Sequence, residues 1–126
     1  MIIMAPISVG ELVDKTTILL IKQQRILNQD KLKNINNELA QLLELLDSLS
    51  GKDYDNIQDL FLELKDINTE LWDIENYKRA CEQDQNFGEG FVNAARQVYL
   101  KNDERARVKR EINRLVGSDI VEEKSY

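Results

Sequence analysis

Two polar stretches of the sequence carry side chains that could bind a small anion. An arginine beside an aromatic wall can hold a carboxylate or a phosphate through the two-pronged geometry of its guanidinium group. The candidate ligand-binding residues are Glu70, Trp72, Asp73, Asn102, Asp103 and Arg105. The same residues can form a network of ion pairs and amides that fixes helix register, and we favour this structural interpretation because buried charges must be paired. In either case we expect Arg105 to pair with Asp66 or Glu70.

A second basic set, Lys15, Lys22 and Arg25, has the spacing of one helix face. Small helical chorismate mutases gather such side chains around a dianionic substrate. This chain lacks the arginine-rich first helix of those enzymes, and Glu11 and Asp14 dilute the positive charge. A solvated helix face is therefore the favoured interpretation.

The composition excludes several other chemistries. The 126 residues include no histidine and one cysteine, which rules out most zinc sites, histidine acid–base catalysis and an intrachain disulfide. No acidic metal-binding loop is present, so we predict no metal, no cofactor and no catalytic residue. Cys81 has the spacing of a core position and is predicted to be a small buried hydrophobe.

Charge and hydropathy bear on partners and location. The net charge of −6 argues against nucleic acid or an anionic membrane as a partner. Residues 1–4 lack the basic and apolar regions of a signal peptide, and no apolar run approaches the ~20 residues that span a bilayer. We expect a cytoplasmic protein.

The longest helical pattern lies between residues 57 and 81, and the other elements must position the polar residues around it. Its apolar residues alternate at spacings of three and four, which is typical of a helix that packs along its whole length against other helices. They are Ile57, Leu60, Leu64, Ile67, Leu71 and Ile74.

Two shorter helical patterns precede this one. Ser8 and Glu11 form a capping box at the start of the first helix. Residues 18–21 are apolar on every side, so we expect the most enclosed part of the fold there. Asp30 is the expected cap of the second helix, and Gly51 is expected to end it in the left-handed conformation.

The third helix is expected to begin at Asp55, and the fourth to end at Gly117. If these two helices form an antiparallel hairpin, residues whose numbers sum to about 172 lie side by side. The fourth helix is polar in its middle, at residues 101–105, where it could break at Asn102-Asp103. We favour one continuous helix because no glycine or proline occurs there.

These patterns predict an all-α protein: two antiparallel helical hairpins that form a four-helix, coiled-coil-like bundle. A single domain would cover residues 1–126, with an extended lead-in (1–7), a first hairpin (8–50), a second hairpin (55–117) and a C-terminal tail (118–126). The third helix is too long to be covered by the first two, so its overhanging apolar stripe should meet a second copy. We expect Ile57, Phe61, Leu115 and Val116 in that contact.

Several motifs carry a resemblance to a known family over nearly the full length of the chain. They are ISVGELVDK (7–15), NTELWDIE (68–75), NDERA (102–106) and EEKSY (122–126). In these motifs the chain resembles a family of small bacterial and phage-associated proteins known only as a domain of unknown function. The resemblance implies a compact helical protein, a weak association with glycosyltransferase and surface-polysaccharide genes, and a tail that belongs to the family pattern. The chain departs from that pattern at Leu20 and Gln24, where family members carry a charged residue.

Two functions remain open from the sequence. The favoured one is a non-catalytic helical interaction or assembly module that acts as a homodimer, with an unknown protein partner also possible. The alternative is a small enzyme or ligand-binding protein for a phosphosugar or carboxylate, linked to surface-polysaccharide metabolism.

Overall fold

The computed structural model consists of four helices in the part of the chain that it describes. That part excludes residues 50, 121, 125 and 126, and only the backbone is described for residues 51–54. The helices are α1 (Val9–Arg25), α2 (Gln29–Asp47), α3 (Gly51–Gln83) and α4 (Glu89–Val116). The described residues contain no strand, and the prediction of an all-α fold is confirmed.

The helix ends follow local capping chemistry. Ser8 caps α1 by accepting a hydrogen bond from the Glu11 backbone N–H at 3.1 Å. Asn28, rather than the expected Asp30, caps α2 by accepting from the Lys31 backbone N–H at 3.0 Å. Asn28 is the cap because the helix begins two residues earlier than expected. This places Asp30 within the first turn, where a negative charge is also favourable.

The long hairpin, which α3 and α4 form, begins at an earlier residue than expected and ends at the expected residue. Ser48, not Gly51, is the C-cap of α2, and α3 begins at Gly51, before the expected Asp55. The chain therefore passes from α2 into α3 through a very short connection. At the other end, Gly117 closes α4 in the left-handed conformation with φ of 64°, as predicted.

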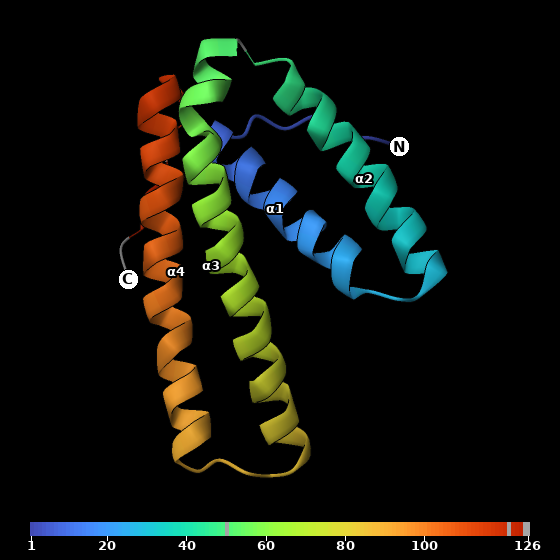
Figure 1. Ribbon diagram of the computed structural model, residues 1–126, viewed down its shortest axis with the longest axis vertical. Coiled ribbons are helices and arrows are strands. Elements are labelled where there is room, and N and C mark those ends of the chain that lie inside the picture. The colour runs from blue at the N-terminus through green and yellow to red at the C-terminus, as the bar shows by residue number, and fades with distance from the viewer. Residues whose placement is uncertain (50, 121, 125–126) are drawn as a thin grey trace.

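Helix α4 is continuous through Asn102 and Asp103, as predicted. It runs antiparallel to α3, and the two lie side by side along the longest axis of the molecule (Figure 1). Ion pairs between Glu70 and Lys101 and between Glu63 and Arg107 fit the expected register within two positions.

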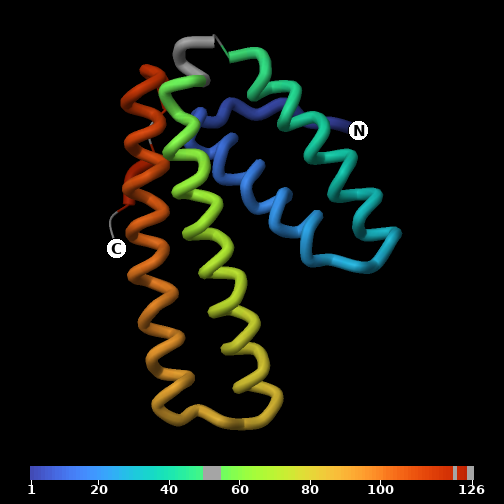
Figure 2. Tube along the Cα trace, in the orientation of Figure 1, coloured from blue at the N-terminus to red at the C-terminus, as the bar shows by residue number. Residues whose placement is uncertain are grey.

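The first hairpin crosses the second at a slant. Helix α1 packs against α2, α3 and α4, whereas α2 makes most of its contacts with α1 and slopes away from the long hairpin (Figure 2). The helices thus form a bundle, but α1 and α2 do not run parallel to α3 and α4 as they would in a coiled coil.

The main core lies where α1 crosses the half of the long hairpin that contains the start of α3 and the end of α4. This is the upper half in Figure 1. Its fully buried apolar side chains include Val13, Leu64, Val108 and Ile112. Thr16 and Thr17 are also fully buried. The most enclosed turn of α1 is therefore residues 13–17, one turn before the expected residues 18–21, because α3 and α4 are both closest at that turn.

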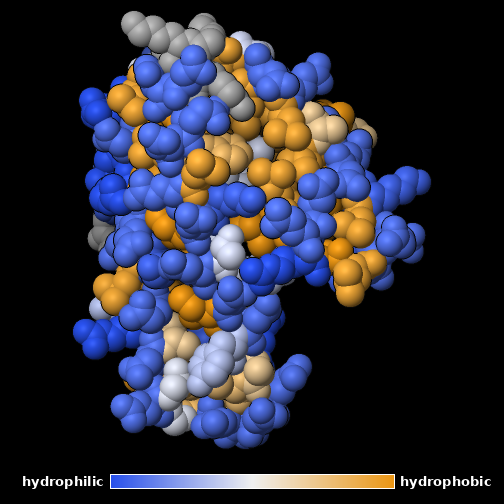
Figure 3. All heavy atoms as spheres, in the orientation of Figure 1, coloured by the Kyte–Doolittle hydropathy of each residue, from blue (hydrophilic) through white to orange (hydrophobic). Residues whose placement is uncertain are grey.

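The end of the long hairpin left uncovered is the opposite one from that expected. Ile57 is 1% exposed, and Phe61 and Val116 pack against the main core, so this end is covered by the chain itself. The prediction that these residues overhang was wrong because α1 crosses at a slant and covers only the upper half. The lower half projects beyond α1 and α2, with apolar and polar surface mixed on the face seen in Figure 3.

Candidate functional site

The six residues predicted to form a ligand site are distributed over separate contacts. Three of them are carboxylates that pair with cations from different parts of the chain. These ion pairs are Glu70 with Lys101 at 2.5 Å, Asp73 with Arg25 at 2.6 Å, and Asp103 with Lys124 at 2.8 Å. Trp72 is half-buried on α3. Only Asn102 and Arg105 contact each other, through a hydrogen bond of 3.3 Å.

Arg105 pairs with Asp14 of α1, so the prediction of a pair with Asp66 or Glu70 was wrong. Its Nε donates to Asp14 Oδ1 at 2.8 Å, and its Nη2 donates to Asp14 Oδ2. The guanidinium group thus grips the carboxylate with two prongs. The hairpin register was predicted correctly, but Arg105 lies on the side of α4 that faces α1 rather than α3.

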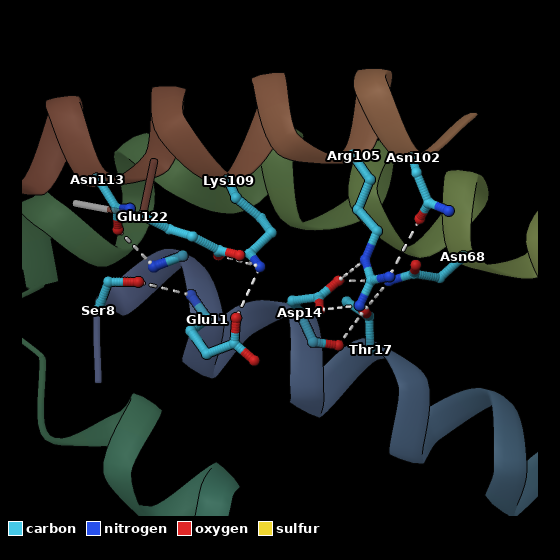
Figure 4. Close-up of polar contacts among 11 residues, drawn as sticks. Ser8, Glu11, Asp14, Thr17, Asn68, Asn102, Arg105, Lys109, Asn113 and Glu122 are labelled. Atoms are coloured by element: carbon cyan, nitrogen blue, oxygen red, sulfur yellow. Dashed lines mark hydrogen bonds and ion pairs between the residues drawn. The ribbon is translucent and has the colours of Figure 1, made fainter. Parts of the chain in front are cut away.

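Asp14 is the most enclosed charge among the described residues, with 1% of its surface exposed. Asn68 of α3 donates to its Oδ1 at 2.9 Å and also donates to Thr17 Oγ1 at 2.9 Å (Figure 4). Burial by itself raises the pKa of Asp14, but the hydrogen bonds and charge of Arg105, the Asn68 amide and the charge of Lys109 outweigh it. The pKa of Asp14 therefore lies below its ordinary value.

Asp14 and Arg105 are one rung of a polar ladder between α1 and α4. The second rung joins Glu11 to Lys109, whose Nζ lies 2.6 Å from Glu11 Oε2. The third is a hydrogen bond of 2.7 Å from the Gly10 backbone N–H to Asn113 Oδ1. The residues on α4 recur every four positions, so all three rungs lie on one face of that helix (Figure 4).

Close approach of the two helices depends on Gly10. A Cβ atom at this position would lie 2.5 Å from the Lys109 backbone oxygen, which is closer than real contacts allow. The absence of a side chain lets the first turn of α1 touch the backbone of α4. The sequence carries the ladder residues at helical spacing, but nothing in it indicates that the first and fourth helices face each other.

The C-terminal tail folds back along α4 and closes a cleft. We use the name strap for its described residues, 118–120 and 122–124. Glu122 Oε2 lies 2.7 Å from Lys109 Nζ, so this ammonium group is held between Glu11 and Glu122. Burial by itself lowers the pKa of Lys109, but the two carboxylates raise it above its ordinary value.

The cleft has a volume of about 350 Å³ and lies between the strap, α4 and the start of α1. Its helical walls are formed mainly by Glu11, Asn102, Arg105, Lys109, Arg110 and Asn113. Two of these residues, Asn102 and Arg105, were predicted from the sequence as ligand candidates. Lys109 and Arg110 were not, because the strap and α1, which make the cleft, are brought there only by the fold.

The remaining sequence candidates have simple positions. Lys15 is exposed and Arg25 pairs with Asp73, so the basic set on α1 does not converge on one site. Cys81 is buried at 6% exposure, as predicted. Ile120 of the strap is 41% exposed, so this β-branched side chain is not buried against the bundle.

The described residues contain neither a metal-binding cluster nor a membrane-spanning helix. No group of three or more histidine, cysteine or acidic side chains there is arranged to hold a metal ion. None of the helices in that part of the chain has the length and apolar character needed to cross a bilayer.

Comparison with known proteins gives one match. The model of a family of unknown function (DUF6165) matches residues 3–126 of the chain. No curated protein and no solved structure matches at a significant level.

Proposed function

Because the chain belongs to this family of unknown function, we propose its function from geometry: it is a non-catalytic helical interaction module that acts as a homodimer. The observation that carries this proposal is the lower half of the long hairpin, which projects beyond the first hairpin (Figure 1). This half exposes apolar side chains. Helix α1 reaches down the hairpin as far as the ion pair between Arg25 and Asp73. Below that point α3 and α4 have only each other for cover.

Two of these exposed apolar side chains lie on the face of α4 that points away from α3. Val92 is 58% exposed and Tyr99 is 54% exposed, and their spacing of seven places both on one face. Ala94, which is buried against α3, lies on roughly the opposite face. Ala95, a small exposed residue, lies between Val92 and Tyr99.

This arrangement suits a two-fold contact between two copies of α4. In an antiparallel pair whose two-fold axis passes between Ala95 and Arg96, Val92 of one copy faces Tyr99 of the partner subunit, and the same contact repeats across the axis. The small Ala95 lets the two helices approach closely. Burying an exposed side chain of this size contributes about 1–2 kcal/mol. The patch is smaller than a standard interface of about 800 Å² per partner, so we expect a dissociation constant in the micromolar range.

Analytical ultracentrifugation over a wide dilution range tests the dimer. The wild-type chain should pass from the monomer mass of 14.7 kDa to twice that mass as its concentration rises. The double variant Val92→Glu/Tyr99→Glu should stay monomeric, because two charges would be buried at the contact. Leu27→Glu is the matched control, because Leu27 is 86% exposed in the α1–α2 connection, away from this face.

Two results would contradict the proposal. A wild-type chain that stays at 14.7 kDa at every concentration has no dimer to explain. A wild-type dimer that Leu27→Glu weakens as much as the double variant does would place the contact elsewhere.

A further inference from the structure

The cleft between α4 and the strap has the chemistry of an anion site. The walls that α1 and α4 contribute contain three cations, Arg105, Lys109 and Arg110, and one carboxylate, Glu11. The strap adds a fourth cation, Lys124, and the carboxylates of Glu122 and Glu123. Within the described part of the chain, no ion pair or hydrogen bond holds the side chain of Arg110, which is exposed at the edge of the cleft. A cation that is positioned at a cleft and has no protein partner is available to a ligand.

Arg105 adds fixed donors to the cleft. Asp14 and Asn102 accept three of its five N–H groups, which leaves one on Nη1 and one on Nη2. The grip of buried Asp14 holds the guanidinium plane in place, so the remaining donors are oriented before a ligand arrives. The volume of about 350 Å³ lies within the range of small-molecule sites.

The strap already places a carboxylate in this site. Glu122 is the second carboxylate in contact with Lys109, besides Glu11, and it binds this ammonium group in the way that an anionic ligand would. Ile120 of the strap is 41% exposed. In the ion pairs of Glu122 with Lys109 and of Lys124 with Asp103, the two carboxylates have 62% and 55% of their side chains exposed. Ion pairs this exposed typically contribute less than about 1 kcal/mol each.

We propose that this cleft binds a small molecule carrying a carboxylate or a phosphate, and that Glu122 is its built-in competitor. The ligand takes the place of the Glu122 carboxylate at Lys109 and gains a second cation in Arg110. The strap thereby loses the ion pair between Glu122 and Lys109 but remains the outer wall of the cleft, which couples ligand binding to loosening of the strap. This inference is independent of the proposed dimer, since the cleft and the outer face of α4 at Val92 are different surfaces.

Titration followed by two-dimensional NMR of the full chain tests both parts of the inference. Inorganic phosphate and succinate serve as separate probes at constant ionic strength, and they distinguish a phosphate ligand from a carboxylate ligand. With either probe, the amide signals of Lys109, Arg110 and Glu122 should shift together. Arg110→Gln should weaken binding at least about fivefold, because a charge-assisted hydrogen bond is lost.

The competitor role predicts the opposite change for Glu122. Glu122→Gln should tighten binding about two- to fivefold, because the ligand no longer displaces a tethered carboxylate. Matched controls come from an exposed pair outside the cleft: Arg107→Gln and Glu63→Gln break the 2.8 Å bridge between α4 and α3. Both controls should bind the probes as the wild type does.

Each part of the inference can fail separately. If neither probe shifts the cleft signals in the wild type or in Glu122→Gln, or if Arg110→Gln binds as tightly as the wild type, the anion site is overturned. If the probes bind at the cleft but Glu122→Gln leaves their affinity unchanged, the site stands and the competitor role is overturned.

Discussion

At the scale of single residues, the pair of Asp14 and Arg105 should stabilise the fold more than the other two rungs of the polar ladder do. Asp14 is buried, so its charge is tolerated only because Arg105 and Asn68 donate hydrogen bonds to its carboxylate. Lys109 contributes at longer range. Removing one partner of such a pair leaves the other charge desolvated and uncompensated, which costs far more than breaking an exposed pair.

Arg105→Ala should lower the free energy of unfolding by about 2–4 kcal/mol, because the buried Asp14 carboxylate loses its counter-charge. Urea unfolding measures this change. Arg107→Ala is the matched control on the same helix: it removes the exposed bridge to Glu63 and should cost less than about 1 kcal/mol. Equal losses in the two variants would mean that the Asp14 pair is no more shielded than a surface bridge.

The lowered pKa of Asp14 makes a prediction about acid. A carboxyl group whose folded-state pKa lies below its unfolded-state value stabilises the fold above the unfolded pKa and loses that contribution as pH falls through the folded pKa. The difference in free energy of unfolding between the wild type and Asp14→Asn should therefore be constant above about pH 5 and shrink below about pH 4. Asp66→Asn, which alters an exposed carboxylate, provides the comparison. A difference from Asp14→Asn that persists unchanged to pH 2 would contradict the assignment.

At the scale of elements, the approach of α1 to α4 depends on the glycine in the first turn. Gly10 and Gly90 are each the second residue of their helix, α1 and α4. A Cβ at Gly10 would meet the backbone oxygen of Lys109, whereas a Cβ at Gly90 would meet the hydroxyl of Tyr77, an exposed side chain that can swing away. Alanine at position 10 would therefore clash with the backbone, whereas alanine at position 90 would clash only with a side chain that can move.

Gly10→Ala should destabilise the protein by about 1–3 kcal/mol, since α1 must shift away from α4. Gly90→Ala should be neutral or stabilising by up to about 1 kcal/mol, because alanine favours a helix more than glycine does. Thermal unfolding of the two variants side by side measures the contrast. Similar melting temperatures would mean that α1 can move off α4 without loss.

At the scale of the whole molecule, the sequence predicted the helices and the long hairpin but not how the two hairpins meet. Apolar spacing identified the core positions of α3, such as Ile57 and Leu64. The expectation that facing residues of α3 and α4 have numbers that sum to about 172 predicted the register of the two helices. The crossing of α1 could not be predicted, because a helical pattern shows which face is buried but not which helix covers it. For the same reason Arg105 was predicted to pair with a carboxylate of α3 rather than of α1, and the cleft that depends on α1 and the strap was missed.

Removing residues 118–126 tests how much the strap contributes to the whole fold. The exposed Ile120 and the two ion pairs of the strap predict a loss of about 1 kcal/mol or less, with the oligomeric state unchanged. Unfolding curves and sedimentation of the truncated chain measure both quantities. A loss of several kcal/mol would show that the tail is part of the core structure.

The polar ladder also has a consequence for the order of folding. The hydrogen bond between Gly10 and Asn113 joins residues 103 positions apart, whereas α3 and α4 are neighbours in the chain and can form their hairpin by local contacts. Because distant contacts require the closure of a long loop, α1 should dock after the transition state, onto a hairpin that already exists. Substitutions in the ladder, such as Asp14→Asn, should then accelerate unfolding and leave the refolding rate nearly unchanged, which stopped-flow measurements can resolve. On this view the ladder governs how long the native state persists rather than how fast it is reached.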